Sequence, residues 1–372
     1  MSAEDSALTE ERGSKGGGID LPWWSIAFPI LAIIAVPLGL AKMGTIGVVV
    51  AAIVLIGSVL AAVHHAEVVA HRVGEPFGTL VLAVAVTVIE VSLIVSLMMS
   101  EAGDASALAR DTVFAAIMII LNGIVGICLL AGGVQFREQR FSLRGVSAAL
   151  NVLVAMAVLT LVLPNYVDSA PGPTYAPSQL VFVAVVSLIL YGTFVLVQTV
   201  RHRSYFLPEG DAEEEHVEPP AMRTVWTAFG ILLIALCGVV LLAKGLAATV
   251  EKAVLEAGLP LAMVGVVIAG VVLAPESLAA YRAARRNRLQ TSLNLALGSA
   301  LATIGLTIPS VAVVSLLLGL PLALGIGVKS LTLLVLSLFS ITLSLGTGRT
   351  TILGGVVHLV IFAVYLFVTV VP

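Results

Sequence analysis

The sequence has little charge and few cysteines. Only 11% of its 372 residues are Asp, Glu, Lys or Arg, whereas 59% are hydrophobic, and the mean hydropathy is +1.11. A soluble domain of this length needs a polar surface, so this composition excludes one. The two cysteines, Cys128 and Cys237, both lie in apolar runs, which argues against a disulfide framework or a cysteine metal site. Lipid is therefore the expected solvent for most of the chain.

The sequence also lacks the motifs of membrane-embedded hydrolases. It has no HExxH, no GxSxG and no aspartate inside its apolar runs, so neither a zinc site nor a serine nucleophile is indicated. His358 lies in the last run without an obvious serine partner. We therefore expect no enzyme, no cofactor and no nucleic-acid partner, with a membrane enzyme kept as a less favoured alternative.

Apolar runs of about 20 residues, the length that crosses roughly 30 Å of hydrocarbon as a helix, occur eleven times. They lie at about 22–40, 45–63, 77–100, 112–133, 144–163, 180–200, 223–243, 258–281, 291–315, 322–345 and 350–371. The sequence predicts an all-α polytopic membrane protein with about eleven transmembrane helices.

The lysines and arginines predict the orientation. Fourteen of them fall in the N-terminal tail and the even-numbered loops, against four in the other loops. The positive-inside rule then places the N-terminus in the cytoplasm and the C-terminus outside. An odd number of spans agrees with this, and the expected location is a bacterial plasma (inner) membrane.

One long polar segment, RHRSYFLPEGDAEEEHVEPPAM, divides the chain. One span plus five precede it and five follow it, so the two five-span units enter the membrane from opposite sides, as in many secondary transporters. The predicted order is a disordered cytoplasmic tail (1–21), a leading transmembrane helix (22–44), a first five-helix repeat (45–200), an acidic cytoplasmic linker (201–222) and a second, inverted five-helix repeat (223–372).

Two glutamates are the only acids within the eleven runs. Glu90 lies in the second span of its unit, fourteen residues after Pro76, and Glu276 lies in the second span of the other unit, sixteen residues after Pro260. A carboxylate inside a bilayer is costly and is a functional candidate by default. A lone buried glutamate can also stay protonated and bond a neighbouring helix. The matching positions favour one shared site that binds small inorganic cations and protons.

A proline adjoins the second glutamate, in VVLAPES. Pro275 has no amide hydrogen and its ring clashes with the preceding turn, so it is expected to break the helix and free the carbonyls of Val271 and Val272. Carbonyl and carboxylate oxygens suit calcium. The alternative is an ordinary packing kink.

Further polar residues lie in the apolar runs. Thr87 offers a hydroxyl within one turn of the first glutamate, and Asn122 lies in MIILNGIVGICLLAGG. Ser299, Thr303 and Thr307 follow an i, i+4, i+8 pattern and share one helix face. This face either lines the site or forms a helix-packing seam.

Two stretches carry a resemblance to a known family. GEPFGTLVLAVAVTVIEVSLIVSLMM, followed by ARDTVFAAIMIILNGIVGICLLAGG, resembles the first signature repeat of bacterial calcium/proton antiporters of the cation/calcium exchanger superfamily. VIAGVVLAPESLAAYRAARRNRLQTSLNLALGSALATIGLTIP resembles the second repeat. The resemblance implies cation/proton antiport, with the essential glutamates at Glu90 and Glu276 and their polar partners at Asn122 and Ser299.

The sequence departs from this family in the residues before each glutamate. Many exchangers carry Gly-Asn there, whereas this chain has Val86-Thr87 and Leu273-Ala274-Pro275, so it resembles the bacterial branch that handles sodium or potassium besides calcium. The linker acids correspond in position to the family's acidic segment, which gathers or senses cations; a solvated linker is the alternative. The central three are Glu213, Glu214 and Glu215.

The predicted function is export of calcium, with sodium or potassium also open, in exchange for protons by alternating access. Two ionised glutamates in one low-dielectric cavity repel each other, so only the neutralised site is expected to switch faces. A sodium or potassium antiporter with little calcium activity is the main alternative, and a passive channel or an organic-solute transporter is less favoured. The sequence leaves a homo-oligomer open.

Overall fold

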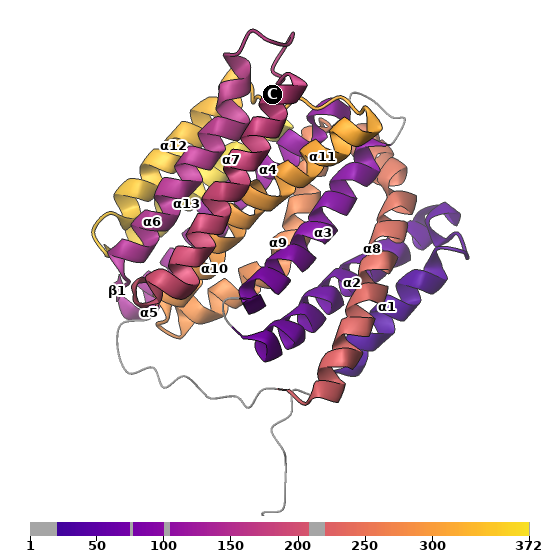
Figure 1. Ribbon diagram of the computed structural model, residues 1–372, viewed down its shortest axis with the longest axis horizontal. Coiled ribbons are helices and arrows are strands. Elements are labelled where there is room, and N and C mark those ends of the chain that lie inside the picture. Colours follow the sequence, from indigo (N-terminus) through magenta and orange to yellow (C-terminus); the bar gives the residue numbers. More distant parts are fainter. Residues whose placement is uncertain (1–20, 75–76, 100–104, 208–219, 372) are drawn as a thin grey trace, which may run out of the picture.

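The computed structural model describes residues 21–74, 77–99, 105–207 and 220–371, and these are almost entirely helical (Figure 1). The helices are α1 (Trp23–Ala35), α2 (Gly44–Val73), α3 (Phe77–Met98), α4 (Leu108–Met118), α5 (Val125–Phe136), α6 (Leu143–Ala157), α7 (Pro177–Leu196), α8 (Met222–Glu256), α9 (Ala262–Arg285), α10 (Leu289–Ala302), α11 (Ile308–Leu318), α12 (Val328–Leu345) and α13 (Ile352–Val370). Two short strands, β1 (Gln139–Arg140) and β2 (Arg349–Thr350), pair antiparallel between the loops that precede α6 and α13.

Several of these helices form longer rods. A π-helical turn at Ile119–Ile124 joins α4 to α5, and another at Thr303–Thr307 joins α10 to α11. Within the described ranges, ten helical rods are long and apolar enough to cross a membrane. The predicted all-helical membrane architecture is confirmed.

The leading helix is shorter than the predicted run at 22–40. α1 has 13 residues and ends at Ala35. Pro37 has no amide hydrogen with which to continue the helical hydrogen bonds, and Gly39 takes a positive φ of 63°. The rest of the run is a turn followed by the start of a short 3-10 helix at Leu40–Lys42.

Two other helices are longer than predicted. α2 continues to Val73 rather than 63, and α8 continues to Glu256 rather than 243. The continuations, HHAEVVAHRV and KGLAATVEKAVLE, contain no proline and many helix-forming residues, so polar side chains do not end the helices. Glu67 and Glu251 therefore lie inside helices. The helices as the structure has them thus contain acids outside the apolar runs, which hold only Glu90 and Glu276.

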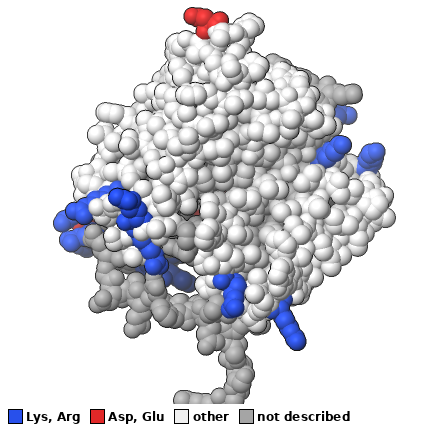
Figure 2. All heavy atoms as spheres, viewed as in Figure 1, with Lys and Arg blue, Asp and Glu red and all other residues white. Residues whose placement is uncertain are grey.

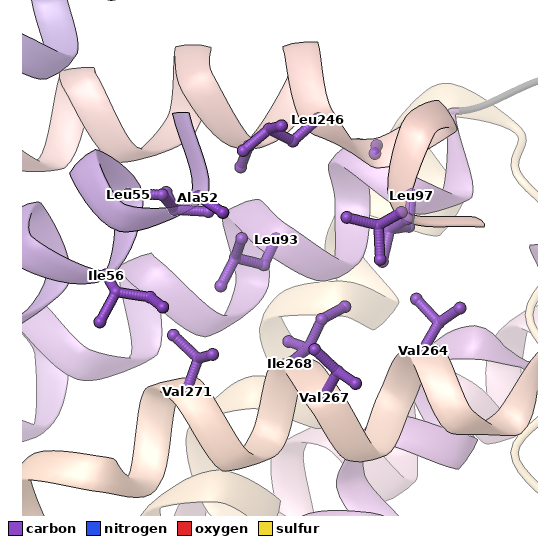
Figure 3. A pocket seen from close by; sticks show the side chains of 13 residues that line it. Ala52, Leu55, Ile56, Leu93, Leu97, Leu246, Val264, Val267, Ile268 and Val271 are labelled. Atoms are coloured by element: carbon purple, nitrogen blue, oxygen red, sulfur yellow. The ribbon is translucent and has the colours of Figure 1, made fainter. Parts of the chain in front are cut away.

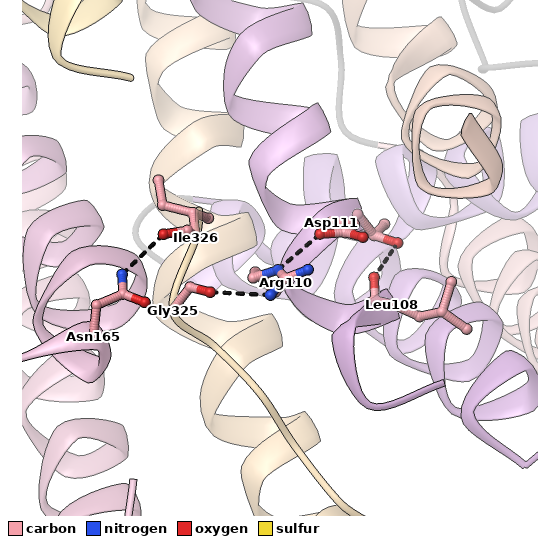
Figure 4. A network of polar contacts seen from close by, with 7 residues as sticks. Leu108, Arg110, Asp111, Asn165, Gly325 and Ile326 are labelled. Carbon is pink, nitrogen blue, oxygen red and sulfur yellow. Dashed lines mark hydrogen bonds and ion pairs between the residues drawn. The ribbon is translucent and has the colours of Figure 1, made fainter. Parts of the chain in front are cut away.

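The predicted run at 322–345 begins too early, because α12 starts at Val328. The segment before it is extended and bonded to its neighbours: the Arg110 Nη1 donates to the carbonyl oxygen of Gly325 at 3.0 Å, and the Asn165 Nδ2 donates to that of Ile326 at 2.9 Å (Figure 4). Asp111 in turn accepts from the Arg110 Nε at 2.8 Å. Side chains of other elements thus satisfy backbone groups that a helix would have paired internally.

The core has two main parts. One group of buried apolar side chains comes mostly from α4 to α7 and α10 to α13, and the other comes mostly from α2 and α8. α3 and α9 contribute to both groups, since Ile94 and Leu273 belong to the first while Leu93 and Val272 belong to the second. Figure 1 shows the same arrangement, with α3 and α9 between α1, α2 and α8 on one side and the remaining helices on the other. The two helices that carry the predicted glutamates therefore lie where the two bodies meet.

The outer surface is apolar over most of its area. Large side chains such as Phe182 and Phe339 are 68% and 63% exposed, as expected for helices in contact with lipid. Figure 2 shows the lysines and arginines of this face in separate groups toward the lower and right-hand edges, with a broad area between them that carries almost none.

Close packing of α5 against α13 generates a stability prediction. A Cβ on Gly355 would lie 2.4 Å from the backbone nitrogen of Leu130, whereas a Cβ on Gly354 would meet nothing closer than 3.5 Å. Gly355→Ala must push the two helices apart and is expected to lower the free energy of unfolding by about 1–3 kcal/mol. Thermal melting of the detergent-purified protein measures this effect, with Gly354→Ala as the matched control. Equal melting temperatures for the two variants would contradict the prediction.

Candidate functional site

The two predicted glutamates meet between the two bodies of the fold. Glu90, on α3, is only 3% exposed, and Glu276, on α9, is partly exposed. α3 packs directly on α9, and the two carboxylates are close enough to interact electrostatically. The structure thus brings together two residues that are far apart in the sequence.

Hydroxyl groups from a third helix bind both carboxylates. The Thr307 Oγ1 donates a hydrogen bond to the Glu90 Oε2 at 2.6 Å, and Thr303 lies one turn before Thr307 on the same rod. The Ser299 Oγ donates to the Glu276 Oε2 at 3.2 Å. All three hydroxyls come from the continuous α10–α11 rod. The sequence left open whether the polar face of this rod lines the site or packs against another helix. In the structure this face contacts the two glutamates.

The π-helical turn at Thr303–Thr307 lies within this contact. Such turns are rare and frequently occur at functional sites. Thr307, the last residue of the turn, makes the shorter of the two measured hydrogen bonds to a glutamate, although the sequence did not single it out beyond its place in the pattern. The i+8 spacing from Ser299 was the signal that could have identified it.

Asn122 lies in the other π-helical turn but points away from the glutamates. Its Nδ2 donates to the Ser337 Oγ at 2.8 Å, and its Oδ1 lies 3.1 Å from the His358 Nδ1. In the described part of the chain no hydrogen bond joins Asn122 to either glutamate. The close approach of α13 to α5 explains this orientation, because it brings His358 within reach of the amide. The expected partnership of Asn122 with the glutamates is therefore not seen.

The Asn122 cluster has a defined direction of donation. An amide oxygen only accepts, so the His358 Nδ1 must carry the hydrogen. Asn122 then donates to Ser337, whose hydroxyl donates to the carbonyl oxygen of Leu333 at 2.7 Å. Asn122, Ser337 and His358 are all 0% exposed. This buried chain ties the α4–α5 rod to α12 and α13.

The residues around Pro275 differ from the prediction. α9 runs without a break from Ala262 to Arg285 with Pro275 inside it, so the predicted helix break is wrong. Neighbouring helices and side-chain hydroxyls let membrane helices accommodate a proline, and the Ser277 Oγ donates to the carbonyl oxygen of Leu273 at 2.6 Å. Val271 and Val272 remain in regular helix. Val271 lines an apolar cavity, and Val272 is buried.

The remaining predicted site residues fall in two places. Thr87 is buried on α3 one turn before Glu90. Glu213, Glu214 and Glu215 lie outside the described residues, so the role of the acidic linker stays a prediction. His65, which follows the apolar run at 45–63, is 0% exposed, and its Nε2 donates to the carbonyl oxygen of Ser25 at 2.9 Å because α1 covers this part of α2.

The Asn122 cluster leads to a prediction on coupling. Asn122→Ala leaves buried groups of Ser337 and His358 without their partner, which typically costs about 1–3 kcal/mol. His358→Ala removes one of these groups, so the double variant should be less destabilised than the sum of the two single variants. Thermal or chemical unfolding of the four proteins measures the difference. Strictly additive losses would show that the two side chains do not interact.

Comparisons with known proteins place the chain in a family. The model of the sodium/calcium exchanger protein family matches residues 43–200 and 227–371. The chain is 49% identical to the putative ionic transporter y4hA of Sinorhizobium fredii, over 95% of this chain and 97% of that protein. It is 37% identical to the sodium-potassium/proton antiporter ChaA of Escherichia coli, over 92% of this chain and 94% of that protein.

Solved structures show the same fold. The structure of native YfkE superposes with a TM-score of 0.72, covering 93% of this chain and 100% of that chain at 16% identity. The H+/Ca2+ exchanger CAX superposes with a TM-score of 0.70, covering 94% of this chain and 89% of that chain at 14% identity. The chain therefore belongs to the sodium/calcium exchanger family of membrane cation transporters, and it is not an enzyme.

Proposed function

We propose that this protein is an antiporter that exchanges a monovalent cation, sodium or potassium, for protons, with Glu90 and Glu276 binding cation and proton in alternation. The observation that carries the proposal is the meeting of the two carboxylates where α3 packs on α9. Carboxylates buried between helices of a membrane protein are functional candidates. The hydroxyls of Ser299, Thr303 and Thr307 supply further oxygens at the same place.

Charge neutrality couples the two ions. With both glutamates protonated the site is neutral, and with both ionised it carries two negative charges that are costly to keep away from water. A monovalent cation together with one remaining proton restores neutrality. If only neutral forms pass between the two faces, each cation that enters must displace one proton, and no covalent step is needed. The proposed stoichiometry is one cation for one proton.

Two features favour a monovalent cation over calcium. Calcium takes 6–8 oxygen ligands, and the amide oxygen of Asn122, which would have added one, is instead bonded to His358. The relative that is 37% identical is a sodium-potassium/proton antiporter. These points support a sodium or potassium antiporter with little calcium activity, which was the alternative interpretation of the sequence.

Calcium export in exchange for protons remains the second candidate. Two ionised carboxylates neutralise one divalent cation without a retained proton, and the packing of α3 on α9 supports a shared site. The exchange would then be one calcium for two protons. The number of protons moved per cation separates this function from the proposed one.

We also propose that the chain lies in a bacterial inner membrane with its N-terminus in the cytoplasm, as one leading helix followed by two inverted five-helix repeats. The distribution of lysine and arginine supports this orientation. In that orientation the inward proton gradient drives cation efflux. The expected surroundings are a lipid bilayer. The proposal is compatible with either a monomer or a homo-oligomer.

Flux measurements test the ion specificity. Purified protein in proteoliposomes under an imposed pH gradient should move sodium or potassium, with about one proton per cation as the neutrality argument requires. Each ion is added separately, and protein-free liposomes are the control. Transport of calcium alone, with two protons per ion, would replace the proposed function by the second candidate.

Substitution of the two glutamates tests the site. Glu90→Gln and Glu276→Gln each remove a carboxylate that must bind both ions, and each should reduce exchange at least about a hundredfold, since breaking a buried charge arrangement costs about 3–5 kcal/mol. Glu138→Gln is the matched control, because its side chain is 44% exposed and lies on a loop. If both site variants exchange ions like the parent, the two glutamates do not form the transport site.

A further inference from the structure

The structure places a third glutamate beside the site. Glu67 lies on α2, which packs against α9, and its carboxylate interacts electrostatically with that of Glu276. Unlike Glu90, which is 3% exposed, Glu67 is exposed. A chain of acidic groups therefore leads from the buried Glu90 through the partly exposed Glu276 to an exposed carboxylate.

The position of Glu67 along its helix shows which face it serves. It precedes the end of α2 at Val73 by six residues, or about 9 Å of helix, whereas Glu276 precedes the end of α9 at Arg285 by nine residues, or about 14 Å. The last turns of both helices are basic, as expected at a membrane surface. Glu67 thus lies between Glu276 and this face, which we name the α2/α9 face.

The other repeat contains a counterpart. Glu67 precedes Pro76 by nine residues, and Glu251 precedes Pro260 by nine residues. Glu251 lies on α8, five residues before its end at Glu256, and α8 packs against α3, which carries Glu90. Each helix before a site helix therefore holds an acid nine residues before a proline, and that helix packs against the site helix of the other repeat.

The two acids differ in their access to solvent. Glu67 is exposed, whereas Glu251 is 1% exposed. An apolar cavity of about 150 Å³ lies on the Glu251 side of the site, between the N-terminal halves of α2 and α9 and the C-terminal halves of α3 and α8 (Figure 3). Its lining includes Leu97, Leu246 and Val264, together with Val250, the residue directly before Glu251. The exposed acid thus lies toward the α2/α9 face, whereas the buried acid and the apolar cavity lie toward the opposite face.

We propose that Glu67 and Glu251 are repeat-related access carboxylates. Glu67 passes cations and protons between Glu276 and the solution at the α2/α9 face, and Glu251 does the same for Glu90 when the opposite face opens. This inference rests on the proposed antiport. Both groups act on ion entry and release, so each governs the apparent affinity at one face and leaves the number of protons moved per cation unchanged.

The titratable surroundings of Glu67 fit this role. On its own helix, His64 lies one turn before it and His71 one turn after it, and the group that faces it from α9 is Glu276. A negative group at the mouth of a charged cleft raises the local cation concentration and the rate of association by roughly tenfold or more. Beside Glu276, the same group also gives a proton a short path to solution.

The test is the sidedness of the effect. Glu67→Gln and Glu251→Gln are compared with the parent in right-side-out and in everted vesicles from a host that lacks its own sodium and potassium antiporters. Each variant should raise the KM for the cation roughly tenfold in one type of vesicle and less than about twofold in the other, with the two variants affecting opposite types. Glu256→Gln, an exposed position on the same helix as Glu251, is the matched control and should match the parent in both.

Two results would overturn the inference: parent-like KM values for both variants, or an equal change in both types of vesicle. Absence of cation/proton exchange by the parent protein would instead reject the proposed function, so the two failures are distinguishable.

A second measurement does not depend on transport. In a background with Cys128→Ser and Cys237→Ser, a thiol introduced by Glu67→Cys should react with a membrane-impermeant maleimide in the absence of ion gradients. A thiol introduced by Glu251→Cys should be protected under the same conditions. Reaction at 251 with protection at 67 would contradict the assignment of the open face.

Discussion

The structure depends on keeping two carboxylates together where water is scarce. Glu90 and Glu276 lie on α3 and α9, the helices that belong to both hydrophobic groups of the core. A dianion at this place has too little solvent to stabilise it, so protons, a cation or polar neighbours must do so. The α10–α11 rod contributes to this stabilisation, since its hydroxyls donate to both carboxylates. The same rod packs in the larger group of the core and therefore links the charge state of the site to the position of one body.

The packing supports a movement of one body against the other. α1, α2 and α8 contact one another extensively and form a compact group beside α3 and α9. The Asn122–Ser337–His358 cluster and the tight crossing of α5 and α13 hold the opposite group together. Hydrogen bonds and close backbone contacts thus lie within the larger body, whereas the boundary toward α2 and α8 is lined mainly by aliphatic side chains. Aliphatic contacts are non-directional and can be exchanged with smaller losses than hydrogen bonds.

Much of the fold and the centre of the site could be predicted from the sequence because lipid imposes simple rules. Helix length and apolarity identified the spans, and the cost of a buried carboxylate singled out Glu90 and Glu276. The ends of α2 and α8 could not be predicted in this way, since a helix that leaves the apolar layer continues as long as its backbone bonds are satisfied. Glu67 therefore lay outside the predicted span, which ended at residue 63. The direction of Asn122 and the unbroken course of α9 through Pro275 depend on neighbours distant in the sequence, namely His358 for the first and the packing around α9 for the second.

The proposed inverted repeats would explain why one structure shows two unlike sides. Equivalent acids on α2 and α8 occupy equivalent positions along the chain, yet Glu67 is exposed and Glu251 is buried. A symmetric sequence pattern in an asymmetric structure implies that the asymmetry belongs to the state and not to the fold. In the opposite state the aliphatic side chains around the cavity would separate on the α8 side and others would close over Glu67. The energies of the two states need to differ by only a few kcal/mol for both to be populated, and apolar contacts that re-form on the other side provide such a balance.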